Sequence, residues 1–303
     1  MLDPTAGFRR ILVATDFGLE GDRAVRRAAR LPLEPRATVV ILHVLPGNLP
    51  MSAASVVAGA AEQELDAARN KLEVLLERRG RRDIVARTRL ARGDAAVEIG
   101  RVAGTTAADL VVVGRGGSGL SGTLSGSTAQ RVARNARVPV LLVRRPPTAP
   151  YRRALVGFDE SPDALRAARV ARRLATAPGA VIFVLHAYQD PRADLAPTLS
   201  KAVAKAKWRA FAPALAGQVR RIRKMLALVD PVRRWPLSFK SGDPRHRLLE
   251  TAQTKRADLL VVGSRSRRGL PRLVLGSVAE AVLNQAPCDV LISPRRAAAV
   301  PRT

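Results

Sequence analysis

The chain has 303 residues and a formal net charge of +27, because 52 Lys and Arg residues outnumber 25 Asp and Glu residues. This length accommodates two ordinary domains, and 47% hydrophobic residues are enough for packed cores. The single cysteine excludes an internal disulfide and indicates a reducing compartment. No segment of about 18 apolar residues lacks a charge, and the first ten residues do not resemble a secretory signal. We therefore expect no membrane span and a cytoplasmic location.

The excess of positive charge would attract polyanions such as nucleic acid, nucleotides or acidic proteins. An arginine-rich composition spread over solvated helix faces explains the same excess without any partner. Aromatic residues make up only 3% of the chain, so stacking platforms for single-stranded nucleic acid are scarce. Composition alone leaves both explanations open.

Short motifs occur twice in the same order, which makes the chain a tandem repeat. The clearest pair is ADLVVVGRG at 108–116 and ADLLVVGSR at 257–265. The offset between the copies grows from 143 residues at Asp16 to 150 residues at Gly126, so loops and one helix differ in length.

A proline-rich segment, RRPPTAP at 144–150, separates the two copies and is the expected linker, because prolines break both helices and strands. We therefore expect one domain over residues 1–146 and a second over residues 147–303.

Runs rich in Val, Ile and Leu alternate with amphipathic segments, five runs in each half. Runs that are apolar on both faces are typical of parallel strands covered by helices. The sequence thus predicts an α/β fold with two doubly wound, open five-stranded parallel sheets, each in strand order 3-2-1-4-5. We expect an intramolecular pseudo-dimer in which the last strands meet around a pseudo-twofold axis, because uncovered apolar edges invite aggregation.

A glycine-marked loop connects the fourth strand of each half to the next helix. In the second half Gly263 ends the strand and Gly276 precedes the helix; Gly114 and Gly126 are the first-half counterparts. Free backbone N–H groups and the positive end of the helix dipole form an anion site at such a position. Phosphate is the expected guest, although a glycine turn followed by an ordinary serine N-cap explains the same residues.

Two familiar nucleotide motifs are missing or misplaced. The sequence contains no G-x-x-x-x-G-K-[ST] segment, which excludes a Walker-type triphosphate loop. A G-x-G-x-x-G match at 114–119 follows the fourth strand instead of the first, and no acid lies near the required downstream position. A dinucleotide-binding fold is therefore not predicted.

Taken together, the motifs resemble the universal stress protein family: a strand ending in V-G-x-D or a near variant, then L-H-V, then G-D, then G-x2-G-x9-G-[ST]. The resemblance covers nearly the whole chain, one domain per half. It implies a five-stranded parallel α/β fold and, for one branch of the family, binding of ATP or AMP, with Mg²⁺ accompanying ATP. Another branch binds no nucleotide. Each half departs once from the motif: Ser266 replaces the second glycine, and the loop from Gly117 to Gly126 is one residue short.

The resemblance also assigns site residues to both halves. In the second half it places the nucleotide against Gly157, Asp159, Ala187, Val262, Gly263, Ser266, Gly276, Ser277 and Val278. The first-half counterparts are Thr15, Asp16, Val44, Val113, Gly114, Gly117, Gly126, Ser127 and Thr128. The aspartates would lie beside adenine and ribose; as the alternative, they cap helices without any ligand.

Other residues carry weaker indications. The segment 192–240 is long and very basic, which suits either a solvated helix face or a face that binds nucleic acid or an acidic protein. We expect His43 and His186 to pack or bond to backbone, and Cys288 to be an inert core residue. No arrangement of residues predicts a catalytic set or a metal site.

We therefore expect a tandem universal stress protein that binds adenine nucleotide and regulates a stress response, with slow ATP hydrolysis at most. Two alternatives stay open: a nucleotide-free stress protein that acts by protein contacts, and a stress factor that associates with polyanions through the basic face.

Overall fold

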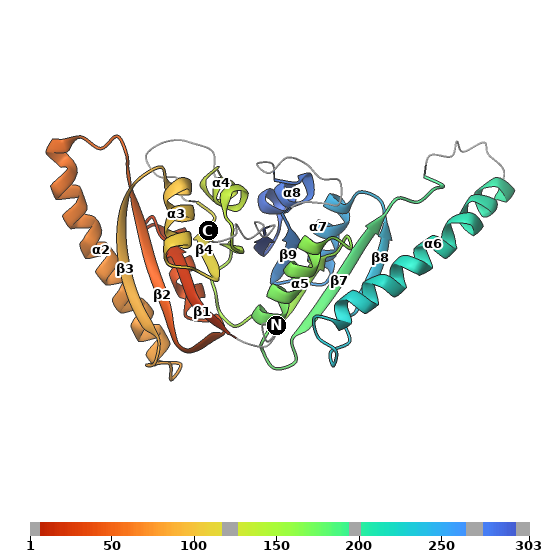
Figure 1. The fold of residues 1–303 in the computed structure, drawn as a ribbon, viewed down its shortest axis with the longest axis horizontal. Helices are drawn as coiled ribbons and strands as arrows, with labels where there is room; N and C mark the ends of the chain where they lie inside the picture. Colours follow the sequence, from red (N-terminus) through yellow and green to blue (C-terminus); the bar gives the residue numbers. More distant parts are fainter. Residues whose placement is uncertain (1–6, 117–126, 194–200, 265–274, 295–303) are drawn as a thin grey trace, which may run out of the picture.

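The computed structural model describes residues 7–116, 127–193, 201–264 and 275–294, and its ten strands form one continuous sheet (Figure 1). The strand order is β3-β2-β1-β4-β5-β10-β9-β6-β7-β8. The first-half strands are β1 (Phe8–Ala14), β2 (Leu33–Pro46), β3 (Val85–Gly93), β4 (Leu110–Gly114) and β5 (Val140–Val143). The second-half strands are β6 (Arg153–Gly157), β7 (Val181–Tyr188), β8 (Leu237–Ser241), β9 (Leu259–Gly263) and β10 (Asp289–Ser293). The predicted order 3-2-1-4-5 is confirmed in both halves, and all strands within a half are parallel.

Helices connect successive strands and cover both faces of the sheet, as parallel pairing requires. Those of the first half are α1 (Leu19–Ala28), α2 (Met51–Glu77), α3 (Ala95–Thr105) and α4 (Ser127–Asn135). Those of the second half are α5 (Pro162–Leu174), α6 (Lys201–Ala227), α7 (Pro244–Thr254) and α8 (Ser277–Gln285). Side-chain caps begin three of them: Asp94 accepts from Val97 N at the start of α3, and Ser161 and Asp243 do the same for α5 and α7.

The last strands of the two halves pair antiparallel, which joins the two expected sheets into one. Leu291 pairs with Leu141, while Val290 pairs with Leu142 and Ile292 with Val140. This register is symmetric about the Leu141–Leu291 pair, so the pseudo-twofold axis passes there. The predicted contact between the fifth strands is confirmed.

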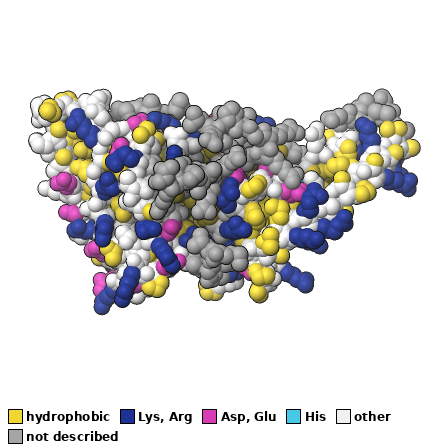
Figure 2. All heavy atoms as spheres, viewed as in Figure 1, with side chains coloured by type: hydrophobic (Ala, Val, Ile, Leu, Met, Phe, Trp, Pro, Cys, Tyr) yellow, Lys and Arg dark blue, Asp and Glu magenta, His cyan; other side chains and the backbone are white. Residues whose placement is uncertain are grey.

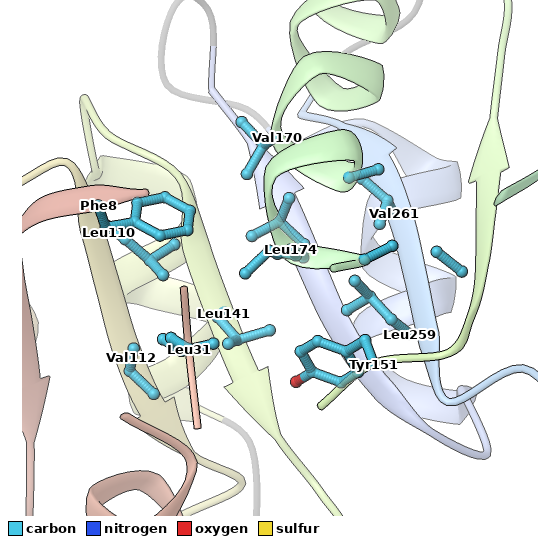
Figure 3. Packing of buried hydrophobic residues seen from close by; sticks show 14 of the residues in the cluster. Phe8, Leu31, Leu110, Val112, Leu141, Tyr151, Val170, Leu174, Leu259 and Val261 are labelled. Carbon is cyan, nitrogen blue, oxygen red and sulfur yellow. The ribbon is translucent and has the colours of Figure 1, made fainter. Parts of the chain in front are cut away.

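The hydrophobic core on the α1 and α5 side of the sheet is continuous across this junction (Figure 3). Phe8 and Leu141 from the first half belong to the same buried cluster as Tyr151, Leu174 and Leu259 from the second. Each of these side chains is at most 2% exposed. The two halves therefore share buried apolar area as one packing unit.

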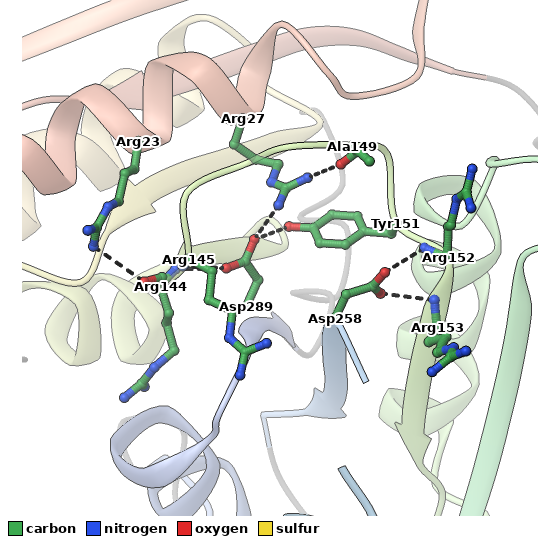
Figure 4. Close-up of polar contacts among 10 residues, drawn as sticks. All are labelled: Arg23, Arg27, Arg144, Arg145, Ala149, Tyr151, Arg152, Arg153, Asp258 and Asp289. Atoms are coloured by element: carbon green, nitrogen blue, oxygen red, sulfur yellow. Dashed lines mark hydrogen bonds and ion pairs between the residues drawn. The ribbon is translucent and has the colours of Figure 1, made fainter. Parts of the chain in front are cut away.

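A buried carboxylate ties the linker to the junction (Figure 4). Asp289 is 1% exposed; its Oδ2 accepts a 2.6 Å hydrogen bond from the Tyr151 hydroxyl and lies 3.1 Å from the Arg27 guanidinium. Its Oδ1 accepts from the backbone N–H groups of Arg144 and Arg145 at 2.8 and 3.1 Å. Burial raises the pKa of Tyr151 well above its usual value, so this phenol remains a proton donor.

The long outer helices α2 and α6 lie at opposite ends of the molecule (Figure 1). Both have 27 residues. In α2 the buried residues, from Ala61 to Leu76, extend along the helix, whereas in α6 only Ile222 and Leu226 near its end are buried. Most of α6 therefore projects from the sheet as an exposed arm.

Candidate adenine-nucleotide sites

The candidate sites lie at the carboxyl ends of the central strands of each half. In the first half β1 pairs with both β2 and β4, and in the second half β6 pairs with both β7 and β9. The chain order reverses between these strands, which is where ligands bind in open α/β sheets. One cavity lies at each of these two positions.

The second-half cavity has a volume of about 170 Å³ and brings together eight of the nine residues predicted there. These are Gly157, Asp159, Ala187, Val262, Gly263, Gly276, Ser277 and Val278. Ser266 lies outside the described residues. Sequence reasoning missed the apolar wall of this cavity, which is formed by Phe158, Ala164, Leu185, Pro244 and Leu248.

The first-half cavity has a volume of about 190 Å³ and is lined by six of the nine predicted residues. These are Thr15, Asp16, Val44, Val113, Gly114 and Thr128. Gly117 and Gly126 lie outside the described residues, and Ser127 is described only by its backbone at the start of α4. The cavity also contains Glu20 and His43, which the sequence did not assign to it.

The start of α8 offers backbone donors to the second-half cavity. Gly276 is the N-cap and makes no side-chain cap hydrogen bond, unlike the capping residues of α3, α5 and α7. Ser277, Val278 and Ala279, the first residues of α8, line the cavity. Their N–H groups have no partner within the helix, so this end of α8 can bind an anion.

The first glycine of each loop is required by packing. A Cβ on Gly263 would lie 2.9 Å from Asp163 Cβ, and one on Gly114 would lie 2.4 Å from Glu20 O. Real Cβ atoms do not come so close to other heavy atoms, so these glycines let α1 and α5 pack against the strand ends. Their presence in the motif is explained by the fold before any ligand is considered.

Asp16 and Asp159 shape the turns that precede α1 and α5. Asp16 Oδ1 accepts from Gly18 N at 3.1 Å, and Asp159 Oδ1 accepts from Ser161 N at 3.0 Å. The alternative interpretation of the aspartates as helix N-caps is wrong, because the N-cap residues of α1 and α5 are Gly18 and Ser161. Each aspartate instead closes an Asx-turn around a residue of positive φ, which leaves its carboxylate at the cavity.

Glu20 distinguishes the first-half cavity. Its side chain is 18% exposed, pairs through Oε1 with Arg23, and has no hydrogen-bond partner at Oε2. Its counterpart Asp163 is 9% exposed, pairs with Arg166, and is not part of the second-half lining. Glu20 thus adds an acidic residue to the lining of the first-half cavity that has no counterpart in the lining of the second.

The two strand-end histidines are bonded to backbone, as predicted. His43 Nδ1 donates to Thr15 O at 2.9 Å, and His186 Nδ1 donates to Phe158 O at 2.7 Å, because a carbonyl oxygen can only accept. Each bond fixes the carbonyl of the residue immediately before the aspartate. The histidines therefore support the turns structurally.

Cys288 is buried, and burial raises the pKa of its thiol to about 12, so the thiol stays protonated at neutral pH. Among the described residues, no group of three or more His, Cys, Asp and Glu side chains could hold a metal ion. Among the helices in the described ranges, none is long and apolar enough to cross a membrane.

Comparison with known proteins agrees with the repeated architecture. The profile of the universal stress protein family matches residues 7–144 and 150–294. A universal stress protein of Mycobacterium tuberculosis is 33% identical over 194 residues, which cover 61% of this chain and only 58% of that relative. One of Mycolicibacterium smegmatis is 29% identical over 299 residues, 93% of this chain and 96% of its own length.

A solved structure shows the same fold. The crystal structure of a universal stress protein from Archaeoglobus fulgidus superposes with a TM-score of 0.66 over 95% of this chain and 99% of that chain, at 19% identity. With the two profile matches, which together cover most of the sequence, this establishes that the chain belongs to the universal stress protein family and carries two of its domains in tandem.

Proposed function

We propose that the chain binds an adenine nucleotide, ATP or AMP, with the second-half cavity as the principal site. The observation that carries the proposal is that the uncapped start of α8 and an apolar wall line one cavity. The N–H groups at Ser277 to Ala279 suit the phosphates. The opposite wall, with Ala187, Leu248 and Pro244, suits the flat apolar faces of adenine.

Polar groups would orient the nucleotide between these two ends. The Asp159 carboxylate lies at the cavity with only its Oδ1 engaged in the turn, so it can accept from ribose hydroxyls or from the adenine amino group. Its negative charge also suits a Mg²⁺ ion accompanying ATP, although the described residues offer no preformed metal cluster there. The proposed role is regulation of a stress response through the nucleotide-bound state.

Mass spectrometry of small molecules released from the purified full chain, followed by calorimetric titration with ATP and AMP, tests the proposal. Release of adenine nucleotide, or saturable binding of either one, supports it. Absence of both would place the protein in the nucleotide-free branch that acts by protein contacts.

A second candidate function, association with a nucleic acid backbone, is supported by the composition of α6. This helix contains eight Lys and Arg residues and no Asp or Glu, whereas α2, at the equivalent place, contains five acids and two bases. The fold therefore does not need a basic outer helix. Figure 2 shows these side chains in dark blue along the arm that α6 forms at one end of the molecule.

The charges of α6 include a stripe on one flank of the helix. Lys205, Arg209, Arg220 and Arg223 are exposed and have no ion pair within the described part of the chain. Like charges three or four residues apart destabilise a helix by a few tenths of a kcal/mol per pair. Phosphates along a duplex would relieve this repulsion. Trp208 already packs against Arg192 and Phe211, so it is not available to stack on bases, and we expect the contacts to be to backbone phosphates.

The test is fluorescence anisotropy with a short DNA duplex at several salt concentrations. Changing the four stripe residues to Gln should lower the slope of log affinity against log salt by about 3 to 4, about 0.9 per lost phosphate contact. The matched control changes four exposed first-half arginines, Arg78, Arg87, Arg134 and Arg137, to Gln and removes the same charge. Equal effects of the two variants would show that net charge, not α6, causes the binding.

A further inference from the structure

A cavity of about 190 Å³ lies at the amino ends of the strands, whereas the proposed nucleotide site lies at their carboxyl ends. It is formed by the turn between α1 and β2, by the end of α2, by Pro150 of the linker and by Thr176 just after α5. Both halves and the linker between them therefore contribute to this junction pocket.

The junction pocket is lined by three arginines and no acidic residue: Arg30, Arg79 and Arg81. Arg81 is occupied, because it donates to the carbonyl oxygens of Leu33 and Glu34 at 2.9 and 3.0 Å and pairs with a nearby aspartate. The guanidinium groups of Arg30 and Arg79 make no hydrogen bond or ion pair with any residue that the structure describes. Two guanidinium groups with free donors thus share one cavity.

Arg30 is held in an unfavourable environment. Burial lowers the pKa of its guanidinium, and the positive charges of Arg79, Arg27 and Arg26 lower it further. A partly desolvated cation beside other cations and without a carboxylate raises the free energy of the folded state. An anion in the pocket would offset this cost, and nothing else among the described lining residues does.

We propose that the junction pocket binds a small, multiply charged phosphate such as inorganic phosphate or pyrophosphate. Guanidinium groups present paired N–H donors that match phosphate oxygens, and two of them can surround a compact dianion. The Thr176 hydroxyl, contributed by the second half, is a further donor at the exposed rim. The ligand would therefore contact both halves beside the linker, independently of any nucleotide at the other edge of the sheet.

Calorimetric titration of the full chain with pyrophosphate, phosphate and the dicarboxylate succinate tests this assignment. The double variant Arg30→Gln/Arg79→Gln should bind pyrophosphate at least about tenfold more weakly, because each charge-assisted hydrogen bond is stronger than a neutral one. The matched control, Arg78→Gln/Arg82→Gln, removes the same charge from exposed positions at the end of the same helix and should change the affinity by about twofold at most.

Thermal unfolding of both variants checks that they fold. Arg30 and Arg79 lie in turns just after α1 and α2, so no helical residue is changed, and loss of an uncompensated cation should leave the stability of the double variant unchanged or raised. Should the double variant fail to fold, Arg79→Gln alone, at an exposed position, must still weaken pyrophosphate binding. Equal weakening by both double variants, unchanged affinity in Arg30→Gln/Arg79→Gln, or equally tight binding of succinate would each overturn the proposal.

Discussion

The two strand-end cavities occupy equivalent places in the two halves, but their linings differ in charge. The second-half cavity has an apolar wall and a single lining carboxylate, Asp159. The first-half cavity has two, Asp16 and Glu20, and one oxygen of Glu20 has no hydrogen-bond partner. The additional negative charge disfavours a phosphate in the first-half cavity, which is why we propose the second-half cavity as the principal nucleotide site.

The halves also differ in sequence at the contact between their last strands. A substitution there is expected to have the largest effect, a loss of unfolding free energy. Asp289 of β10 stands where the first half has Pro139. Changing Asp289 to Asn should cost about 3–5 kcal/mol of unfolding free energy, because it leaves the buried Arg27 charge without a counter-ion. Urea unfolding followed by circular dichroism measures this.

The control for the junction is Asp258→Asn, which affects a carboxylate that accepts from the backbone of Arg152 and Arg153. The loss of unfolding free energy should be about 1 kcal/mol, because Asp258 forms no ion pair with a buried cation in the described part of the chain. Comparable losses of unfolding free energy in both variants would mean that the ion pair of Asp289 with Arg27 does not stabilise the contact between the halves.

Substitution of Gly276 by Val tests most directly whether the second-half cavity is the principal site. Its φ of −66° is accessible to Val, so the fold should persist. The side chain would block approach of a phosphate to the start of α8, and the affinity for ATP should fall by more than about tenfold. Calorimetry on the full chain measures this, and Gly126→Val in the first half is the matched control that should leave most binding intact.

Glu20→Gln tests whether the additional acidic residue weakens nucleotide binding in the first half. Removing the carboxylate at the first-half cavity should raise the affinity of that half for ATP by a few-fold, on the scale of partly screened charge interactions. The second-half variant Asp163→Asn should leave affinity unchanged, since Asp163 pairs with Arg166 away from the cavity. Titrations of both in a Gly276→Val background isolate the first site; an unaltered affinity in Glu20→Gln would remove charge from the explanation.

The smallest expected effect is on the ratio of the affinities for ATP and AMP. Arg265, Arg267 and Arg268 belong to the second-half loop and lie outside the described residues; the first loop has only Arg115 at this position. We expect the full chain to prefer ATP over AMP and the preference to shrink as salt rises, because exposed charges are screened. Titrations at low and high salt measure the ratio. Equal affinities at low salt would exclude these arginines from binding.

The strand order, the contact between fifth strands and eight residues of the second-half lining could be predicted, because parallel pairing and motif position constrain them tightly. The place of Glu20 in the first-half lining could not be predicted, since it depends on how α1 packs against the end of β4. The apolar wall was missed for a similar reason: Leu248 and Pro244 belong to α7, which no motif connects with the loop. The packing role of Gly114 and Gly263 likewise needed the position of neighbouring helices.

The antiparallel pairing of β5 with β10 has a consequence for any fragment of the protein. In the full chain this pairing leaves β3 and β8 as the outer strands of the sheet. A single half produced alone would expose its fifth strand as a free edge with unsatisfied N–H and C=O groups. Because the register is symmetric about Leu141 and Leu291, each fragment carries a surface that fits a second copy of itself. Separated halves should therefore associate in pairs at high concentration, whereas in the full chain covalent connection supplies a high effective concentration and makes pairing independent of dilution.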